Sequence, residues 1–525
     1  MKEFKESKNK TCLSEKFLFL LPAFLLTLVS LLFIYAEASI ISPAKILVPV
    51  ISLWAVLFLL IWPTHKITQS WAWTGASLAI IVIGFYLSET VFKTVTMLYF
   101  ASFFSLSVIF WLTKRKLTSK LLAIASNIIA LALLLFIFSY YINIIKIIEW
   151  VPYKNALFQS KNMLPVTNSF QNNRPDIYYI VLDGYARADI LEQYYQFDNS
   201  EFIAYLTKKG FFVSKKSHSN YPKTLFSVTS TLNFDYIQKI TAGAETSRLL
   251  WLINLFWLNN RTQLFLEQSG YTSISIASDW ELSNNPTTDI YFKPSPIFLN
   301  EFDGFVLAKT PLKLFEPVLS QIAFVPSFES HRELILYNFE VLEKIAAMPE
   351  PTFTVAHIIA PHPPFVLDEN GASLTPKYAF SFIDETSIPV TDEEYRNGYT
   401  AQIKFVNQKL ETLIDSILAK SDTPPIIILQ ADHGPRRVTD LSSFDNKCQK
   451  ERFAIFAAYH LPGLNKNPIP DNITPVNLFR IILNEYFSTN LPILENRSYS
   501  TEDIAYSYRF VDVTSELEKN CLVNP

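Results

Sequence analysis

The sequence is poor in glycine, cysteine and charge. It has 11 Gly and 3 Cys among 525 residues, and charged residues make up 18%, below the roughly 25% that is typical of soluble proteins. Neither GxGxxG nor GxxxxGK followed by Ser or Thr occurs, so a glycine-rich phosphate loop of those kinds is not expected. The net charge of −3 gives no indication of nucleic-acid binding. Apolar residues are plentiful instead, at 50% of the chain.

The apolar excess lies in the first 150 residues. Five spans there are each close to the ~20 residues that cross the hydrocarbon core of a membrane. They cover 17–36, 46–62, 71–88, 94–112 and 121–145. The lysine-rich lead-in makes a signal peptide the alternative for the first span, but its length and the lack of a small-x-small exit favour a retained helix. We therefore predict a bundle of about five transmembrane helices over 1–147.

The placement of lysine and arginine predicts how these spans are oriented. The alternate loops hold only Lys45 and Lys93, whereas basic residues gather before the first span and after the second and fourth. These are Lys2, Lys5, Lys8, Lys10, Lys16, Lys66, Lys114, Arg115, Lys116 and Lys120. The N-terminus is therefore expected in the cytoplasm. An odd number of spans in the inner membrane then places the rest of the chain on the periplasmic or extracellular side.

The cysteines agree with this topology without deciding it. Cys448 and Cys521 fall in the exterior part, where a disulfide could persist, and Cys12 falls on the cytoplasmic side. Because a sequence gives no separation between two residues, a disulfide and two free buried thiols both stay open.

The exterior part alternates short apolar runs with helix-like stretches. A polar linker, 148–174, precedes it. Predicted strands are 176–182, 211–214, 272–277, 353–359, 425–431 and 453–459, and predicted helices include 199–209, 223–233, 246–268, 331–347 and 393–420. Runs that are apolar on both faces and separated by helices predict a mostly parallel sheet covered on both sides. The expected fold for 175–525 is therefore an α/β domain with a mostly parallel central sheet flanked by helices.

Chemically capable side chains follow three of the predicted strands. The stretch "VLDGYAR" ends one strand at Asp183, and "IIILQADHGPR" ends another at Asp432 and His433. His362, in "APHPPF", follows a third. Ligands gather at the carboxyl ends of parallel strands, and carboxylates with a neutral imidazole suit Zn²⁺ or Mn²⁺. The alternative for each motif taken alone is a solvated turn.

A helix with a threonine at its head supplies a candidate nucleophile. Pro222 disfavours helix at the residue before it, so the helix is expected to begin near Thr224. Free amides and the helix dipole make that end a natural place for a phosphate or sulfate, and a metal there would make the hydroxyl a nucleophile. The alternative is a plain N-cap. Ser227 is the rival nucleophile, but one turn inside the helix its hydroxyl is expected to bond to a backbone carbonyl.

The order of these motifs resembles the alkaline phosphatase superfamily, in its sulfatase-like membrane branch. That branch includes the lipoteichoic acid synthases and the phosphoethanolamine or phosphoglycerol transferases. The resemblance covers about 175–465 and rests on "YIVLDGYAR", "QADHGPR" and, less specifically, the Thr224 segment. It implies that one divalent ion, Mn²⁺ or Zn²⁺, is bound by Asp183, Thr224, Asp432 and His433. It also implies that Thr224 is the nucleophile and that His362 lies on the substrate side.

The sequence also departs from the family patterns. The Cys-x-Pro-x-Arg segment of true sulfatases is absent, so formylglycine chemistry is not expected. An Asp-x-x-x-His pair after the helix is also absent, which favours one metal over two while leaving a second open. The first acid is a Glu in the lipoteichoic acid synthases and Asp183 here, which leaves the subfamily undecided.

Residues around the motifs could contact the substrate. Arg436 or Arg437 could clamp a phosphate oxygen, with a solvated surface pair as the alternative. Lys223 and Asn220 flank the nucleophile segment and could bind the substrate, or could belong to a plain turn.

The remaining histidines are expected to be structural. His218 and His331 are expected at the surface, and His357 in the core with its hydrogen bonds satisfied. His460 is expected to be structural, with an approach to the metal as the alternative. Arg187 and Asp189 are expected to pair with one another.

These expectations combine into one hypothesis. The chain would transfer a phospho-head group from a phospholipid donor, through a phosphothreonine, to a hydroxyl of a glycan or lipid acceptor at the outer face of the membrane. One alternative is a phosphodiesterase or sulfatase-like hydrolase with the same site and water as acceptor. Another is a non-enzymatic membrane sensor or scaffold that keeps the fold.

Overall fold

The structure is a computed structural model, and it describes most of the chain. The described segments are 13–37, 46–91, 174–241, 251–295, 301–308, 316–319, 325–348, 351–378, 388–437, 449–464, 467–503 and 506–517, with a few isolated positions between them. The chain divides into two units: Met1–Trp150 with Glu301–Ile322, and Val151–Asn300 with Ala323–Pro525. Each unit is described by itself.

The first unit is built from apolar helices. Its described elements are α1 (Leu13–Glu37), α2 (Leu47–Thr68), α3 (Trp71–Val91), α13 (Glu301–Ala308) and α14 (Glu316–Leu319). Leu20, Leu57 and Leu78 meet in the cluster that joins α1, α2 and α3. Gly75 lets α3 approach α1 closely, because a Cβ at this position would lie 1.8 Å from the carbonyl oxygen of Phe19.

Three of the five predicted membrane spans fall on described helices. The spans 17–36, 46–62 and 71–88 correspond to α1, α2 and α3. Within the described residues, one segment, Pro49–Thr68 of α2, is long and apolar enough to cross a membrane, and α1 and α3 contain shorter apolar stretches. The spans 94–112 and nearly all of 121–145 lie outside the described residues, as do the three cysteines. The five-helix bundle therefore stays a prediction.

The second unit is organised around a seven-stranded sheet in its described part. The strands are β1 (Ile177–Leu182), β2 (Phe212–Val213), β3 (Thr272–Ile276), β4 (Ile290–Phe292), β5 (Thr352–Ile358), β6 (Ile426–Ala431) and β7 (Ala457–His460). Their order is β2-β7-β6-β1-β5-β3-β4. All pairs from β6 to β4 are parallel, and β7 runs antiparallel to both its neighbours. The predicted mostly parallel sheet is confirmed.

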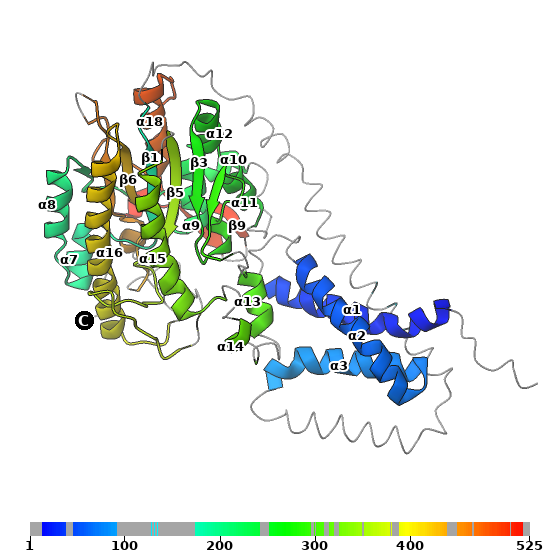
Figure 1. The fold of residues 1–525 in the computed structure, drawn as a ribbon. Coiled ribbons are helices and arrows are strands. Elements are labelled where there is room, and N and C mark those ends of the chain that lie inside the picture. Colours follow the sequence, from blue (N-terminus) through cyan, green and yellow to red (C-terminus); the bar gives the residue numbers. More distant parts are fainter. Residues whose placement is uncertain are drawn as a thin grey trace, which may run out of the picture. The chain divides into compact units, whose positions relative to one another are not determined.

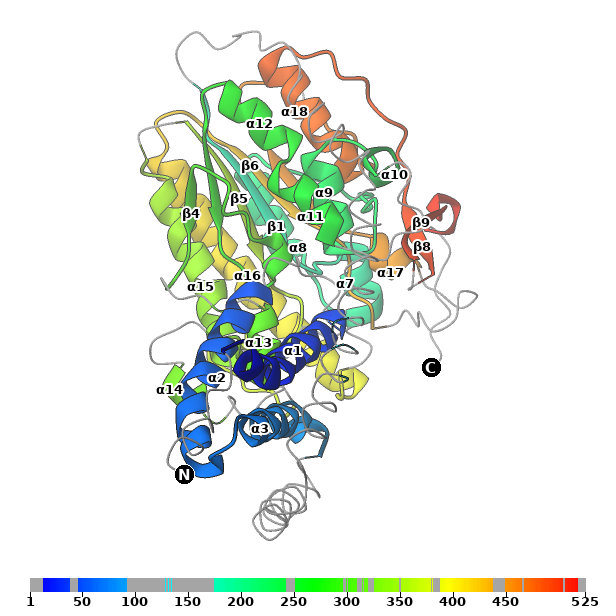
Figure 2. The ribbon, with the colours of Figure 1, turned by 90° about the vertical axis from the view of Figure 1, so that its right-hand side faces the viewer.

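Helices cover both faces of this sheet. They are α7 (Ala188–Tyr195), α8 (Ser200–Lys208), α9 (Thr224–Leu232), α10 (Ile237–Ile240), α11 (Trp251–Leu258), α12 (Arg261–Gln268), α15 (Phe328–Ile345), α16 (Asp392–Lys420), α17 (Gln449–Phe453) and α18 (Leu478–Phe487). Figure 1 shows α15 and α16 on one side of the sheet, and Figure 2 shows α9, α12 and α18 on the other. A small hairpin, β8 (Tyr499–Asp503) with β9 (Tyr506–Asp512), forms a separate two-stranded sheet.

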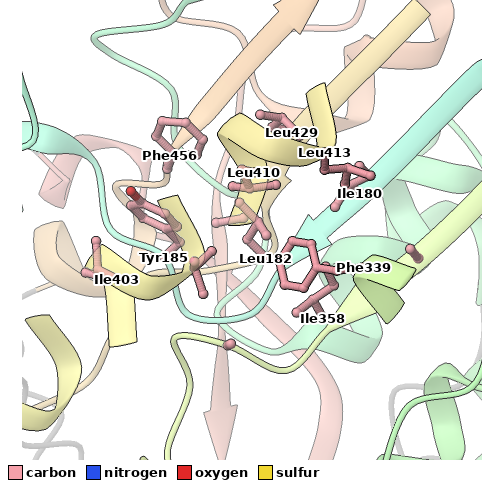
Figure 3. Close-up of a cluster of buried hydrophobic side chains, with 14 of the residues drawn as sticks. Ile180, Leu182, Tyr185, Phe339, Ile358, Ile403, Leu410, Leu413, Leu429 and Phe456 are labelled. Carbon is pink, nitrogen blue, oxygen red and sulfur yellow. The ribbon is translucent and has the colours of Figure 1, made fainter. Parts of the chain in front are cut away.

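The two faces of β1 are buried against different helices. Ile180 and Leu182 face the cluster formed with Leu410 and Leu413 of α16 (Figure 3). Tyr179 points the other way and meets the ring of Phe479 in α18 edge to face, with the ring centroids 5.5 Å apart. All six residues of β1 are buried, as expected of a parallel strand covered by helices on both sides.

Most predicted elements appear within a few residues of their expected bounds, with two differences. The predicted helix 246–268 is α11 followed by α12, and its first residues lie outside the described part of the chain. The break comes at Asn260, whose side chain accepts a hydrogen bond from the amide of Gln263 and so caps α12. The three-residue β4, the β8–β9 hairpin and the helices α7, α10, α17 and α18 are not among the predicted elements.

Candidate active site

Three buried side chains meet at the carboxyl ends of the central strands. Asp183 and Asp432 directly follow β1 and β6, and His357 is the penultimate residue of β5. His357 is in register with Val181, which lies two residues before Asp183. Since alternate residues of a strand share a face, this register places the imidazole on the same face as Asp183. His357 was expected to be a satisfied core histidine, and the structure instead directs it at the acids.

The atoms of these side chains converge on one point. One potential ligand atom from each of Asp183, His357 and Asp432 lies within 4.8 Å of the others. His357 Nε2 is 3.2 Å from Asp183 Oδ2. Asp183 Oδ1, Asp432 Oδ2 and both ring nitrogens of His357 are buried without a hydrogen-bond partner among the described residues. Buried carboxylate oxygens are costly unless a donor or a cation satisfies them. The donor set therefore fits a divalent metal ion.

His433 joins the same cluster from the β6 side. Its Nε2 lies 3.2 Å from Asp432 Oδ2 and 3.6 Å from Asp183 Oδ1. Its Nδ1 lies 3.0 Å from the carbonyl oxygen of Gly434. Because a carbonyl only accepts, Nδ1 carries the proton of the neutral ring and the lone pair of Nε2 faces the acids. This is the tautomer that a metal ligand needs.

Thr224 lies at the start of α9, beside His433. Its Oγ1 is 3.2 Å from His433 Nε2, and the residue is buried. Thr224 is the first helical residue, and Lys223 is the N-cap in an extended conformation, so the plain N-cap alternative for Thr224 does not hold. The first amides of a helix have no acceptor within the helix. The hydroxyl is therefore close both to these donors and to the acid cluster.

Ser227, the rival nucleophile, is buried one turn further into α9. Its amide donates to the carbonyl of Lys223 at 3.0 Å. The predicted bond from its hydroxyl to a backbone carbonyl is not seen within the described part of the chain. The short contact to His433 belongs to Thr224, and this geometry favours Thr224 as the nucleophile.

Arg452, on α17, connects the two halves of the site. Its Nε donates to the carbonyl of Pro222, two residues before Thr224, at 2.8 Å. Its Nη1 donates to the carbonyl of Gly434, the residue after His433, also at 2.8 Å. The amide of Gly434 donates back to the carbonyl of Arg452 at 2.7 Å. One guanidinium thus links the start of α9 to the turn that carries His433.

Glycine is required in both turns that carry the acids. Gly184, after Asp183, has a φ of +74°, and its amide donates to Asp432 Oδ1 at 3.1 Å. A Cβ on Gly434 would lie 2.1 Å from the carbonyl oxygen of Glu451. The first glycine allows a left-handed turn and the second allows close backbone packing. The Asp-Gly and Asp-His-Gly motifs therefore fix the two carboxylates relative to each other.

His362 lies at the edge of the cluster. Its amide donates to the carbonyl of Asp183 at 3.0 Å, and its own carbonyl accepts from Gln402 Nε2 at 3.2 Å. The ring is half-buried, with its centroid 6.4 Å from that of His433. This position leaves His362 beside the proposed ligands, and its role on the substrate side stays a prediction.

The charges of the cluster shift the pKa of its members in opposite directions. Burial alone would raise the pKa of Asp183, but the imidazoles of His362, His357 and His433 outweigh it and hold that pKa well below its usual range. Burial and the charge of Asp183 raise the pKa of Asp432 to about 6. Burial, together with the charge of Arg452, lowers the pKa of His433 well below its usual value. His433 is therefore neutral at pH 7.

The structure gives the predicted substrate residues unequal positions. Asn220 has a structural role, because its amide nitrogen donates to the carbonyl of Arg497 at 2.7 Å and its oxygen accepts from the amide of Val476 at 2.8 Å. We therefore leave Asn220 out of the proposed site. Lys223 and Arg436 are half-buried next to Thr224 and after the Asp-His-Gly turn, respectively. Both stay predicted substrate contacts.

Arg437 and two histidines are placed differently from the expectation. Arg437 forms an ion pair with Asp392, at 2.7 Å between Nε and Oδ1, rather than a solvated pair with Arg436. His331 and His218 were expected at the surface and are buried. The first lies against Asp279, and the second lies 3.3 Å from Arg187 Nη1. The partner residue explains why each histidine is buried, and the sequence spacing predicts neither of these contacts.

Two other expectations on structural residues are confirmed. Arg187 pairs with Asp189, at 2.7 Å between Nε and Oδ1. His460 has a structural role, with its Nδ1 donating to the carbonyl of Pro425 at 2.8 Å.

Sequence reasoning missed two residues of the site, His357 and Arg452. A polar residue within an apolar strand was the available signal for His357, and the β1–β5 register was needed to interpret it. Arg452 gave no signal, because it acts on the carbonyls of residues 230 and 18 positions away along the chain.

The chain was compared with known families and structures. No protein-family model and no curated protein matches it. Among solved structures, it is similar to the C-terminal periplasmic domain of EcEptC from Escherichia coli, at 13% identity and a TM-score of 0.43, covering 67% of this chain and 96% of that chain. The corresponding domain of phosphoethanolamine transferase EptC from Campylobacter jejuni has 12% identity, a TM-score of 0.36 and coverage of 67% and 97%.

Other neighbours come from related groups. A protein in the alkaline phosphatase superfamily from Vibrio parahaemolyticus has 13% identity, a TM-score of 0.38 and coverage of 67% of this chain and 81% of that chain. Sulfatases are also among the structural neighbours. These are the groups that the sequence motifs resemble. At such identities and scores the likeness carries no inference about the reaction, so the proposals below rest on the residues of the site.

Proposed function

We propose that this protein is a metal-dependent enzyme that transfers a phospho-head group from a phospholipid to a hydroxyl acceptor through a phosphothreonine at residue 224. The observation that carries the proposal is the position of Thr224. Its hydroxyl lies at a helix N-terminus, 3.2 Å from His433 Nε2. Beside it are two buried carboxylate oxygens, Asp183 Oδ1 and Asp432 Oδ2, that have no hydrogen-bond partner among the described residues. A scaffold without catalysis would have no need for this convergence of nucleophile, acids and imidazole.

Asp183, Asp432 and His433, with Thr224, are the residues that would hold the ion, as the sequence motifs imply. His357 is a further ligand candidate, from its 3.2 Å contact with Asp183. When bound, Mn²⁺ or Zn²⁺ would supply Lewis acidity, which polarises a phosphoryl oxygen and lowers the pKa of a nearby hydroxyl. The acids and the neutral imidazole are the ligand types that both metals accept.

The remaining steps are carried out by the chain itself. The oxygen of Thr224 forms a bond to phosphorus, and the bond between phosphorus and the diacylglycerol oxygen breaks. Thr224 loses one proton and the diacylglycerol oxygen gains one, and we propose that His362, whose ring centroid is 6.4 Å from that of His433, delivers the second proton. The first amides of α9 stabilise the negative charge on the phosphoryl oxygens. Attack by the acceptor hydroxyl then reverses these steps and releases Thr224.

The apolar N-terminal unit gives this reaction its location. We propose the topology predicted from the lysines, with the N-terminus in the cytoplasm and the catalytic unit on the outer side of the membrane. α2 contributes the described segment that is apolar enough to span. Attachment to the membrane restricts the site to the neighbourhood of lipid head groups, which raises the effective concentration of the donor.

The test uses the full-length protein in detergent with phospholipids that carry phosphoethanolamine or phosphoglycerol head groups, and with Mn²⁺ or Zn²⁺ added. We expect release of diacylglycerol and a peptide containing Thr224 with the mass of one added head group. Release that depends on a hydroxyl acceptor supports the transferase, whereas equal release into water supports the hydrolase. The absence of release with either metal and every donor would contradict the proposal.

A further inference from the structure

A second buried pair of titratable residues lies beside His357. Asp279 follows β3, and His331 is in the first turns of α15. His331 Nδ1 lies 2.6 Å from Asp279 Oδ2, and both side chains are almost completely buried. Neither residue belongs to the cluster of Asp183, Asp432 and His433. Burial of such polar groups is costly unless they are hydrogen-bonded, so each polar atom of this pair needs a partner.

A small cavity connects this pair to the site. It has a volume of about 10 Å³ and is bordered by Ser278, Asp279, His331, Asn338 and His357, together with apolar side chains. That volume is sufficient for the centre of one water molecule. Asp279 Oδ1, Asn338 Oδ1 and His357 Nδ1 are buried polar atoms of bordering residues that have no hydrogen-bond partner among the described residues. One water with three such partners is the usual solution in protein interiors.

The chemistry of these three atoms determines which of them donates. Asn338 Nδ2 donates to the carbonyls of Ala277 at 3.0 Å and of Leu334 at 2.9 Å, so Asn338 Oδ1 is fixed as an acceptor. Asp279 Oδ1 is a carboxylate oxygen and also accepts. A water that satisfies both uses its two hydrogens. It then has only lone pairs left for His357, and His357 Nδ1 must donate.

We propose that Asp279, with Asn338, positions His357 as a metal ligand through a bridging water. The water fixes the tautomer with the proton on Nδ1, so the lone pair of Nε2 faces Asp183 Oδ2 at 3.2 Å. Two acceptors at that distance repel each other, so this is the tautomer that a bound cation would stabilise. Asp279 and Asn338 are positioning residues that act through His357, and His331 holds the carboxylate of Asp279 in place. The inference rests on the metal site of the proposed function.

The test measures Zn²⁺ affinity of the full-length protein by competition with a chromophoric chelator. Asp279→Asn is nearly isosteric, and its amide would offer the water a donor in place of an acceptor. Asn338→Leu removes the second acceptor. We expect each variant to bind Zn²⁺ about 10- to 100-fold more weakly, the range for residues that orient a metal ligand. Asp176→Asn is the matched control. Asp176 directly precedes β1, at the opposite end of that strand from Asp183. Its carboxylate accepts hydrogen bonds from the amide and the hydroxyl of Thr352.

A double-mutant cycle separates positioning from a general structural role. In a His357→Ala background, Asp279→Asn should change Zn²⁺ affinity by less than ~2-fold, since the residue it acts through is gone. Equal losses in both backgrounds, or no loss in the wild-type background, would overturn the inference. Thermal melting in excess EDTA verifies that each variant is folded. The cycle measures Zn²⁺ binding alone. It can therefore support the role of Asp279 even if no head group is transferred, and it can contradict that role even if the transfer is observed.

Discussion

The hydroxyl of Thr224 and Nε2 of His433 lie 3.2 Å apart, although 209 positions separate the two residues in the chain. Thr224 is the first residue of α9, and His433 lies two residues after the end of β6, so the contact joins two elements that are far apart in the sequence. The bond from His433 Nδ1 to the carbonyl of Gly434 leaves Nε2 as an acceptor toward Thr224. The contact therefore depends on the backbone of both elements, which Arg452 holds together.

Removal of the Thr224 hydroxyl should abolish head-group release. We expect Thr224→Ala to lower the rate by at least ~10³-fold, as loss of a nucleophile does in other covalent enzymes. Thr224→Ser should retain part of the activity because it keeps an oxygen in the same place. The matched control is Ser227→Ala, one turn along α9 and also buried, which should stay within a few-fold of wild type. Diacylglycerol release measures all three, and a reversed order would identify Ser227 as the nucleophile.

Metal removal should stop the reaction, and His357 should contribute to metal affinity. Dialysis against EDTA is expected to abolish release, and Mn²⁺ or Zn²⁺ to restore it. We expect His357→Asn to bind Zn²⁺ about 10- to 100-fold more weakly. His460→Asn is the control, since that ring bonds the carbonyl of Pro425 outside the cluster. Full activity in the presence of excess chelator would argue against metal dependence, and equal affinities of the two variants would remove His357 from the site.

Arg452 should affect activity more than stability alone explains. Arg452→Lys cannot reach the carbonyls of Pro222 and Gly434 together, because it replaces a rigid fork with one ammonium. We expect stability to fall by ~1–3 kcal/mol and the rate by ~10²-fold, from displacement of Thr224 relative to His433. Arg480→Lys is the control, since that guanidinium bridges the carbonyls of Phe234 and Pro492 away from the site. Similar melting temperatures with a rate loss only in Arg452→Lys would support the positioning role, and parallel rate losses would count against it.

The sequence predicted those site residues that belong to short local motifs. Asp183, Asp432 and His433 follow buried strands directly, so the strand-end rule sufficed to place them together. His357 could not be placed this way, because its approach to Asp183 depends on the register of β5 against β1. Arg452 is harder still, since its contacts form only when the chain returns to the sheet at α17. Residues that act through tertiary contact leave no periodic pattern.

The same distinction applies to the fold. β1, β5 and β6 are apolar on both faces and were found, whereas β4 has three residues and the β8–β9 hairpin lies outside the main sheet. His331 and Asp279 were missed because each looks like an ordinary surface residue until its partner is known.

Gly434 should tolerate no side chain. A Cβ there would lie 2.1 Å from the carbonyl oxygen of Glu451, and backbone cannot move aside as cheaply as a flexible side chain. We expect Gly434→Ala to lower the melting temperature markedly, at a cost above the ~1 kcal/mol of a simple backbone penalty. Gly463→Ala is the control, with a φ of +80° and nothing within 4 Å of its Cβ, and should cost only about that penalty. Equal costs would mean that the contact with Glu451 is not tight.

His218 should make the protein less stable in acid. Burial, with the charge of Arg187, lowers the pKa of His218 from 6.5 to about 4 in the folded protein. Between these values the unfolded chain binds a proton that the folded protein does not, so the free energy of unfolding falls as the pH falls through this window. One pKa unit corresponds to about 1.4 kcal/mol, so acidification from pH 7 to 5 should remove ~2 kcal/mol through this residue. His218→Gln has no group to protonate and should lose correspondingly less. Unfolding in guanidinium at both pH values, with chelator in excess so that metal release does not contribute, compares the two slopes. Identical slopes would show that His218 is protonated at the same pH in the folded and unfolded states.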